Sequence, residues 1–309
     1  MIVLFPAAIM RFPILFRPTL FLLVALTTMQ AHAELSQKQV TRLIARTAGL
    51  ELPTKAVRVG KIRQLGPAAA ETTAEIELVF RLTQNGSGHW FISEMRTGQD
   101  KWEQLEIVAR AARFELPKGN CDAPDLGTSA TVTDLSVKRV RCLIAGLLGV
   151  HLPSDAVRIK DVSSLDLPLG TQTSALAVTL VRLDIRLGKD ARGWHVAEVR
   201  CGSPNWINLE TVLPEVDLVK RTVATDELNE IAHALEAFRQ ERGFFVVSDK
   251  LSVLIDFLSP HYLARVIRVD PWHNPYYYQG ERDRFNVSSA GPDGKPNTAD
   301  DIVVTNPSR

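Results

Sequence analysis

The sequence predicts an α+β protein in which two tandem copies of a helix-plus-antiparallel-sheet unit precede a third domain with a helix on a small sheet. Residues 35–58 repeat as residues 135–158, with matching Leu, Val, Ile, Gly and Pro positions. Residues 90–108 repeat as residues 194–212, at a spacing of 104 rather than 100. After residue 217 the pattern changes to an amphipathic helix followed by short aromatic strands.

Each copy is predicted to start with a helix that a serine caps, Ser36 in the first copy and Ser136 in the second. Gly49 and Gly149 stand where these helices should end. Alternating apolar and polar residues then predict antiparallel strands at 74–82, 90–95, 183–187 and 194–199. A final helical segment is expected to begin at Trp102 and at Trp206.

The first 33 residues are predicted to be a secretory signal peptide. Arg11 and Arg17 precede a short apolar run, and Ala31-His32-Ala33 is typical of a cleavage site. A retained membrane anchor is the alternative, and either Met1 or Met10 is the start. No later stretch is long and apolar enough to span a bilayer. The protein is therefore expected to be exported, to the periplasm or the extracellular space.

The repeat pattern sets the expected domain boundaries. They are a signal peptide at 1–33, a first α+β repeat at 34–116, a linker at 117–133, a second α+β repeat at 134–217 and a C-terminal domain at 218–309.

Charge and cysteine content limit the classes of partner and chemistry. The chain holds 36 Lys and Arg against 35 Asp and Glu, so no nucleic-acid partner is expected. Export implies an oxidising environment, in which three cysteines form at most one internal bridge. Cys142 lies off the apolar stripe of its helix, and Cys121 lies in the loop before that helix, so Cys121–Cys142 is the favoured pair. Three free thiols, Cys201 included, are the alternative.

The repeats contain no catalytic motif, so we predict a protein that is not an enzyme. Glu94 and Glu198 alternate with apolar residues on predicted strands, which favours exposed cross-strand ion pairs over a pocket role. His89, His151 and His195 have no partner at ligand or triad spacing, so we expect none of them to act chemically.

The C-terminal segment begins with an amphipathic helix at 225–239, for which Thr225 is the expected cap and Gly243 the end. A short helix at about 250–258 follows. Alternating aromatics then begin a strand near Tyr276, and residues 283–287 are its expected antiparallel partner.

Two motifs in this segment stand out together: Asp270-Pro-Trp-His-Asn-Pro-Tyr276, and the ending Ser289-Ala-Gly-Pro-Asp-Gly294 with Asp300-Asp301. Residues 221–304 resemble the C-terminal globular domain of the major pseudopilin of type II secretion systems, secretion protein G. The resemblance implies a helix packed on a small antiparallel sheet and a calcium ion in the last loop.

The residues of this loop fit calcium on chemical grounds as well. Asp293, Asp300 and Asp301 place three carboxylates within nine residues, and Ser289 and Asn297 add neutral oxygens. Calcium takes six to eight oxygen ligands from flexible loops. These five residues are the predicted metal ligands, with Asp293 and Asp301 first. A solvated acidic turn is the alternative, and the loop departs from the family in being shorter, with Asn297-Thr298 where a Gly-rich stretch is usual.

Two functions from different classes follow. The first is an exported, non-enzymatic, calcium-stabilised protein whose repeats bind a protein partner at the cell envelope. Assembly into a pseudopilus is not expected, because the two repeats occupy the place of the pilus helix. The second is a small-ligand-binding protein or enzyme. Residues 88–94 and 193–198 look like the hairpin of cystatin-like or NTF2-like rolls, which would supply its pocket.

Overall fold

The computed structural model describes residues 35–112, 121, 135–148, 155–165, 174–202 and 204–306. The chain divides into Met1–Glu34 and the compact unit Leu35–Arg309. The expected signal peptide and all of the linker except Cys121 lie outside the described residues. No helix within the described ranges is long and apolar enough to cross a membrane.

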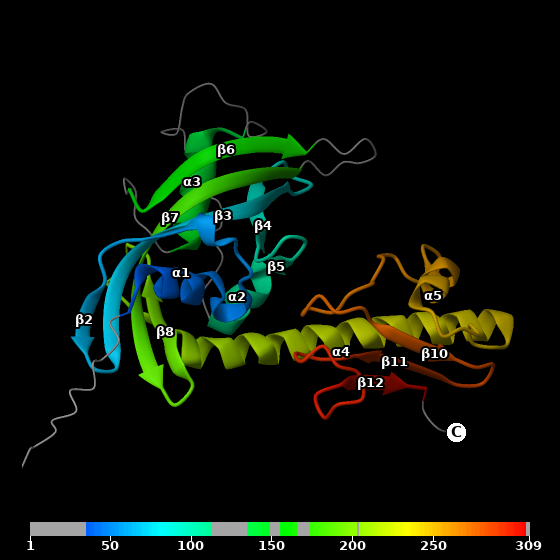
Figure 1. Cartoon of the computed structure of the whole chain (residues 1–309). Helices are drawn as coiled ribbons and strands as arrows, with labels where there is room; N and C mark the ends of the chain where they lie inside the picture. The colour runs from blue at the N-terminus through cyan, green and yellow to red at the C-terminus, as the bar shows by residue number, and fades with distance from the viewer. Residues whose placement is uncertain are drawn as a thin grey trace, which may run out of the picture. The chain divides into compact units, whose positions relative to one another are not determined.

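One antiparallel sheet contains the strands of both repeats (Figure 1). Its path is β5-β4-β3-β7-β8-β9, with β1 and β2 paired to β3 and with β6 paired to β7. The strands are β1 (Val57–Val59), β2 (Arg63–Gly66), β3 (Ala69–Gln84), β4 (Trp90–Arg96), β5 (Trp102–Gln104), β6 (Val157–Leu165), β7 (Ser174–Asp190), β8 (Gly193–Arg200) and β9 (Ile207–Asn208). We predicted a sheet for each repeat, and the structure joins the two sets of strands in one sheet.

The sheet is symmetrical about the β3–β7 pair, which extends from Ala69 opposite Gly188 to Thr83 opposite Ser174. Each long strand bears its own hairpin partner on the outer side, β4 on β3 and β8 on β7. A register shift follows Arg81 in one hairpin and Arg186 in the other. The two copies therefore share a register irregularity as well as a sequence pattern.

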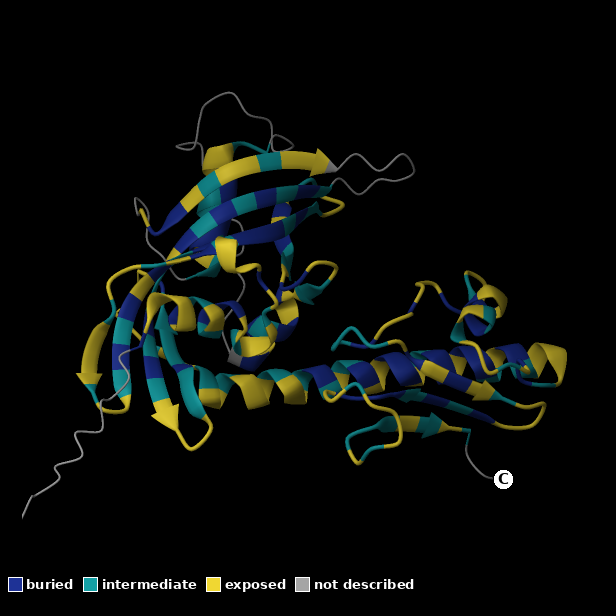
Figure 2. Cartoon of the chain, viewed as in Figure 1, coloured by how far each residue is buried: buried dark blue, intermediate teal, exposed yellow. Residues whose placement is uncertain are grey.

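Helix α1 (Gln37–Ala45) and helix α3 (Val137–Leu147) begin as predicted. Ser36 accepts a hydrogen bond from the Gln39 amide, and Ser136 accepts one from the Arg139 amide. Their apolar faces belong to the buried core of the sheet unit (Figure 2), whose helical members include Val40, Ile44, Val140, Leu143 and Ile144. Gly49, at φ 78°, lies in a 3₁₀ turn (Thr47–Gly49) just after α1, and a second 3₁₀ turn spans Thr54–Ala56.

The structure pairs Cys121 with Cys142, the bridge that the sequence favoured, with the two Cα atoms 5.8 Å apart. Cys201 is a buried free thiol. The bridge connects the region between the repeats to α3, because Cys142 lies on that helix.

Both repeats end in a helix after a short strand, α2 (Leu105–Ala112) and α4 (Leu209–Arg242). Trp102 opens β5, and Trp206 lies just before β9, so each tryptophan precedes its helix by a few residues. Helix α4 continues into the C-terminal domain, and α2 packs against it (Figure 1). The boundary that we expected at 217/218 therefore lies within one helix.

The predicted cap at Thr225 is wrong. Asn208 caps α4, and its side chain accepts hydrogen bonds from the Glu210 and Thr211 amides. Thr225 lies inside the helix, where its hydroxyl donates to the Arg221 carbonyl oxygen at 2.8 Å. No glycine or proline interrupts the chain between Pro214 and Gly243, so the helix continues through Thr225. Gly243, at φ 82°, ends it as predicted.

The C-terminal domain packs α4 on a second sheet of order β10-β11-β12. Its other elements are α5 (Leu251–Leu258), β10 (Tyr277–Gly280), β11 (Phe285–Ser289) and β12 (Ile302–Thr305). The predicted stripe of α4 is buried from Leu228 to Phe238 and contacts Phe245, Tyr278 and Val287 in a separate core (Figure 2). This is the helix-on-small-sheet arrangement that the sequence predicted.

Candidate functional site

The acidic loop connects β11 to β12 and turns sharply on itself. Gly291 and Gly294 have φ values of 63° and 65°, a conformation that side chains rarely adopt. A Cβ on Gly291 would lie 2.5 Å from the Asp300 carbonyl oxygen, and one on Gly294 would lie 2.9 Å from Asn274 Oδ1. Glycine at these positions allows oxygen atoms to approach the backbone closely.

Three predicted ligands of this loop surround one hydroxyl group. Thr298 Oγ1 lies 2.6 Å from Asp300 Oδ1, 3.3 Å from Asp301 Oδ1 and 3.5 Å from Asp293 Oδ1. The Thr298 hydroxyl and then the Asp293 amide lower the pKa of the Asp300 carboxyl by hydrogen bonding to it. Sequence spacing alone identified the three carboxylates but did not place Thr298 at their centre.

The other two predicted ligands take different places. Asn297, at φ 67°, donates its backbone amide to Asp301 Oδ2 at 2.8 Å. Ser289 is buried and donates its hydroxyl to Asp270 Oδ2, at 2.5 Å, rather than to one of the three carboxylates. Asp270 therefore holds the Ser289 side chain, and Ser289 in turn accepts a hydrogen bond from the Gly291 amide at 3.0 Å.

The Asp-Pro-Trp-His-Asn motif supports the loop from the neighbouring turn. Asp270 Oδ1 accepts hydrogen bonds from the Trp272 and Asn274 amides, at 3.0 and 2.9 Å. The Asn274 side chain then donates to the Gly291 carbonyl oxygen at 3.0 Å. The motif thus fixes the start of the acidic loop, a role that the sequence did not reveal.

The donor set of the loop fits calcium, since carboxylate, hydroxyl and carbonyl oxygens are the ligands that this ion takes in proteins. Asp293, Asp300 and Asp301 would supply the charge, and backbone carbonyls and water would complete the shell. The three carboxylates share contacts with Thr298 but do not bring one oxygen each within 4.8 Å of the others.

A stacked ion pair occurs once in each repeat of the large sheet. Arg81 pairs with Glu94 across β3 and β4, and its guanidinium lies 4.2 Å from the Trp102 ring centroid. Arg186 pairs with Glu198 at 2.9 Å across β7 and β8, and its guanidinium lies 4.0 Å from the Trp206 ring centroid. The Arg, Glu and Trp residues that recur in both repeats therefore stabilise the sheet through ion pairing and cation–π contact.

This arrangement does not favour the ligand-binding alternative. Glu94 lines a hollow of about 440 Å³ with Phe91 and Ile92, but its carboxylate is already paired with Arg81. The predicted cross-strand ion pairs are present, and each glutamate pairs with an arginine of the adjacent strand.

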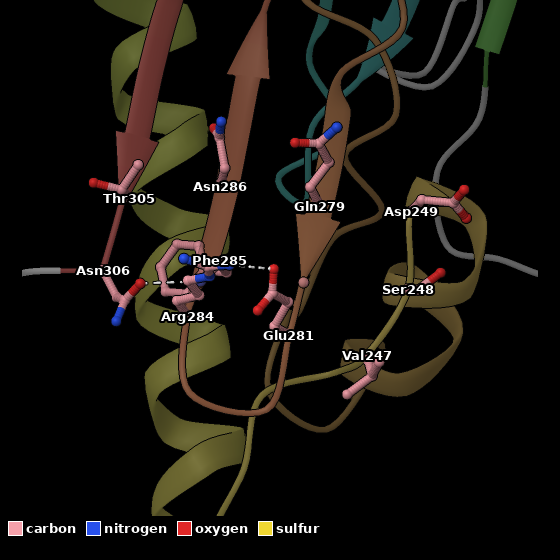
Figure 3. A pocket seen from close by; sticks show the side chains of 11 residues that line it. Val247, Ser248, Asp249, Gln279, Glu281, Arg284, Phe285, Asn286, Thr305 and Asn306 are labelled. Carbon is pink, nitrogen blue, oxygen red and sulfur yellow. Dashed lines mark hydrogen bonds and ion pairs between the residues drawn. The ribbon is translucent and has the colours of Figure 1, made fainter.

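A groove of about 880 Å³ lies at the end of the β10–β11 hairpin (Figure 3). Glu281 and Arg284 form an ion pair at 2.6 Å beside it, and the Asn306 side chain accepts a hydrogen bond from the Phe285 amide at 3.0 Å. These contacts close the hairpin. Neither of them pairs a nucleophilic side chain with a base.

The architecture of the C-terminal part is that of a long helix on a three-stranded sheet with an acidic last loop. Residues 211–306 match the family model of type II secretion system protein G. The match covers α4 almost from its start, the strands β10 to β12 and the acidic loop. It overlaps the second repeat only at residues 211–217 and leaves the rest of the repeats outside. Comparisons with curated proteins and with solved structures find no match to this chain.

Proposed function

We propose that this is an exported, non-enzymatic protein of the cell envelope whose C-terminal pseudopilin-like domain is stabilised by calcium. The match of residues 211–306 to type II secretion system protein G carries the proposal. The repeats would serve as interaction modules for a protein partner, because Glu94, which lines the hollow on their large sheet, is already paired with Arg81.

The acidic loop supports a structural role for the ion. It joins β11 to β12, so an ion held by Asp293, Asp300 and Asp301 would fix the edge strand of the small sheet. In the absence of calcium, the three carboxylates repel one another, and Thr298, backbone amides and the nearby Arg221 guanidinium offset part of this repulsion. A divalent cation would neutralise that charge and hold the loop in its folded form.

Thermal melting of the purified protein in calcium and in chelator tests the proposal. An ion that binds only the folded state stabilises it by about 2.7 kcal/mol when its free concentration is 100 times the dissociation constant. We therefore expect a higher melting temperature in millimolar calcium than in chelator. Equal melting temperatures would remove the ion from the proposed function.

The variant Asp293→Ala identifies the site. We expect it to lose the calcium-dependent part of the melting temperature, because it removes one carboxylate from the loop. Asp226→Ala is the matched control, since it removes an exposed aspartate of α4 in the same domain. A calcium response in Asp293→Ala equal to that of the control would exclude this ligand.

A further inference from the structure

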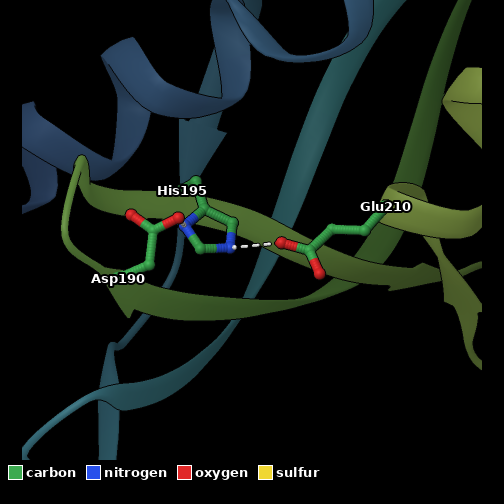
Figure 4. Close-up of side chains that lie close together, drawn as sticks. All are labelled: Asp190, His195 and Glu210. Carbon is green, nitrogen blue, oxygen red and sulfur yellow. Dashed lines mark ion pairs between the residues drawn. The ribbon is translucent and has the colours of Figure 1, made fainter.

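A second group of side chains that can bind a metal lies where the β7–β8 hairpin of the large sheet meets the start of α4, far along the chain from the acidic loop. Asp190, His195 and Glu210 are the described residues whose ligand atoms, one from each side chain, all lie within 4.8 Å of one another. Asp190 ends β7, His195 lies on β8, and Glu210 lies in the first turn of α4 (Figure 4). We propose that this group is a binding site for a zinc-like divalent transition-metal ion.

The contact between His195 and Glu210 has the geometry that zinc requires. His195 Nε2 lies 3.4 Å from Glu210 Oε1. Nitrogen and oxygen ligands at about 2.1 Å from a tetrahedral ion are roughly 3.4 Å apart. An ion between these two atoms therefore needs little movement of either side chain. Asp190, whose Oδ2 atom lies 4.0 Å from the other ring nitrogen, Nδ1, would turn toward the ion as the third ligand.

The second nitrogen of the ring is placed to orient it. His195 Nδ1 lies 3.4 Å from the Gly193 carbonyl oxygen. A ring that donates from Nδ1 to a backbone carbonyl presents the lone pair of Nε2, which is the usual arrangement of a metal-bound histidine. Nε2 is also the atom that faces Glu210 (Figure 4).

Gly188 makes room for the imidazole. It is the cross-strand partner of His195, and a Cβ at Gly188 would lie 3.2 Å from His195 Nε2. The ring therefore lies across the glycine and reaches toward Glu210. Gly188 acts as a positioning residue for the site.

The charges of the group suit a cation that enters from solvent. The side chains of Asp190, His195 and Glu210 are 34%, 31% and 61% exposed. Arg192 holds the Asp190 carboxylate through hydrogen bonds from its backbone amide and its guanidinium. Arg192 also competes with a metal ion, because its Nε and Nη2 atoms bond Asp190 Oδ2 at 3.0 and 2.8 Å.

The first repeat lacks this site, which provides a built-in comparison. Phe91 stands opposite Thr83 where His195 stands opposite Gly188, and Asn85 occupies the place of Asp190 in the repeat. The site is thus specific to the second repeat. An ion bound there would connect the tip of the β7–β8 hairpin to the start of α4.

Calorimetric titration of the purified protein with zinc chloride tests the proposal, with calcium in excess to occupy the acidic loop. We expect one zinc ion per chain. His195→Phe should lose this binding, and phenylalanine is the residue that the first repeat carries at the equivalent position. Glu210→Gln should weaken binding at least about tenfold.

Two further variants distinguish zinc binding at these three residues from zinc binding elsewhere on the protein surface. Arg192→Ala should tighten zinc binding, because it frees Asp190. His261→Ala is the control, since His261 is exposed and faces Glu241 at 3.8 Å, and it should bind zinc as the unaltered protein does. Absence of zinc binding in both the unaltered protein and Arg192→Ala, or undiminished binding in Glu210→Gln and His195→Phe, would overturn the proposal. Asp293→Ala should still bind zinc. This result would show that the zinc site does not depend on the calcium ligands of the acidic loop.

Discussion

Cys201 follows β8 and is 7% exposed. Its Sγ atom lies 3.5 Å from the Arg182 carbonyl oxygen, to which the thiol donates a weak hydrogen bond. Burial, and then the nearby Asp184 carboxylate, raises the pKa of the thiol from 9.0 to about 11. The folded state therefore holds this proton more tightly than the unfolded state does.

The raised pKa predicts a loss of stability in alkali. The thiol's contribution is fully present below about pH 9 and is lost as the pH rises through about 11, because the folded protein must then bury a thiolate. We expect the free energy of unfolding to fall more steeply over this range in the unaltered protein than in Cys201→Ala. Urea unfolding at several pH values measures the difference, which cancels the tyrosines and lysines common to both proteins. If the free energy of unfolding falls equally with pH in the two proteins, burial does not raise the pKa of the Cys201 thiol.

Single residues also show how far sequence could define the two candidate sites. Asp293, Asp300 and Asp301 are close in sequence, so their spacing alone predicted the group, and in the structure an oxygen of each lies within 3.5 Å of Thr298 Oγ1. Ser289 was assigned to the same group by proximity, but its hydroxyl satisfies the buried Asp270 instead. His195 was given no role because Glu210 reaches it only through the packing of α4 against the sheet.

At the scale of elements, the spacing of apolar residues and the positions of capping residues predicted most helices and strands. Ser36 and Ser136 cap their helices because a hydroxyl at that position satisfies a free amide of the first turn. The same reasoning failed at Thr225, since a threonine inside a helix can bond the carbonyl four residues earlier. A residue type permits a cap but does not require one, and the start of α4 was decided by Asn208.

Substitution of the two candidate cap residues tests which of them begins α4. Asn208→Ala removes the acceptor for the Glu210 and Thr211 amides, so we expect a loss of about 1 kcal/mol of stability. Thr225→Ala should cost much less, because alanine is the best helix former and no helix end is affected. Urea unfolding of both variants measures the contrast. A larger loss in Thr225→Ala would place a helix start there after all.

At the scale of the whole molecule, the joining of the repeats in one sheet could not be predicted. The alternation of residues shows which face of a strand is buried but not which strand lies beside it. The edges of β3 and β7 pair with each other over almost their full lengths, which removes two exposed edges at once. Duplication of a unit with one free edge therefore favours a shared sheet over two separate ones.

The connection between the large sheet and α4 includes a buried ion pair. Lys220 Nζ on α4 lies 2.8 Å from Glu103 Oε2 on β5, and the two side chains are 10% and 14% exposed. Glu103 Oε1 is buried with no hydrogen-bond partner among the described residues. The pair joins residues 117 positions apart in the chain, so its loss bears on the packing of the whole molecule.

Removal of one partner of this pair should cost far more than removal of both. Glu103→Ala leaves the Lys220 ammonium buried without an opposite charge, which typically costs about 3–5 kcal/mol, whereas exchange of a buried pair for apolar residues is often close to neutral. We therefore expect Glu103→Ala to lower the free energy of unfolding strongly and the double variant Glu103→Leu, Lys220→Met to recover most of the loss. The exposed pair of Glu51 and Lys101 is the control, and Glu51→Ala should change stability little, because water already solvates both groups. If Glu103→Ala unfolds at the same urea concentration as the control, Lys220 is solvated in the native protein and the sheet is not held to α4 by this contact.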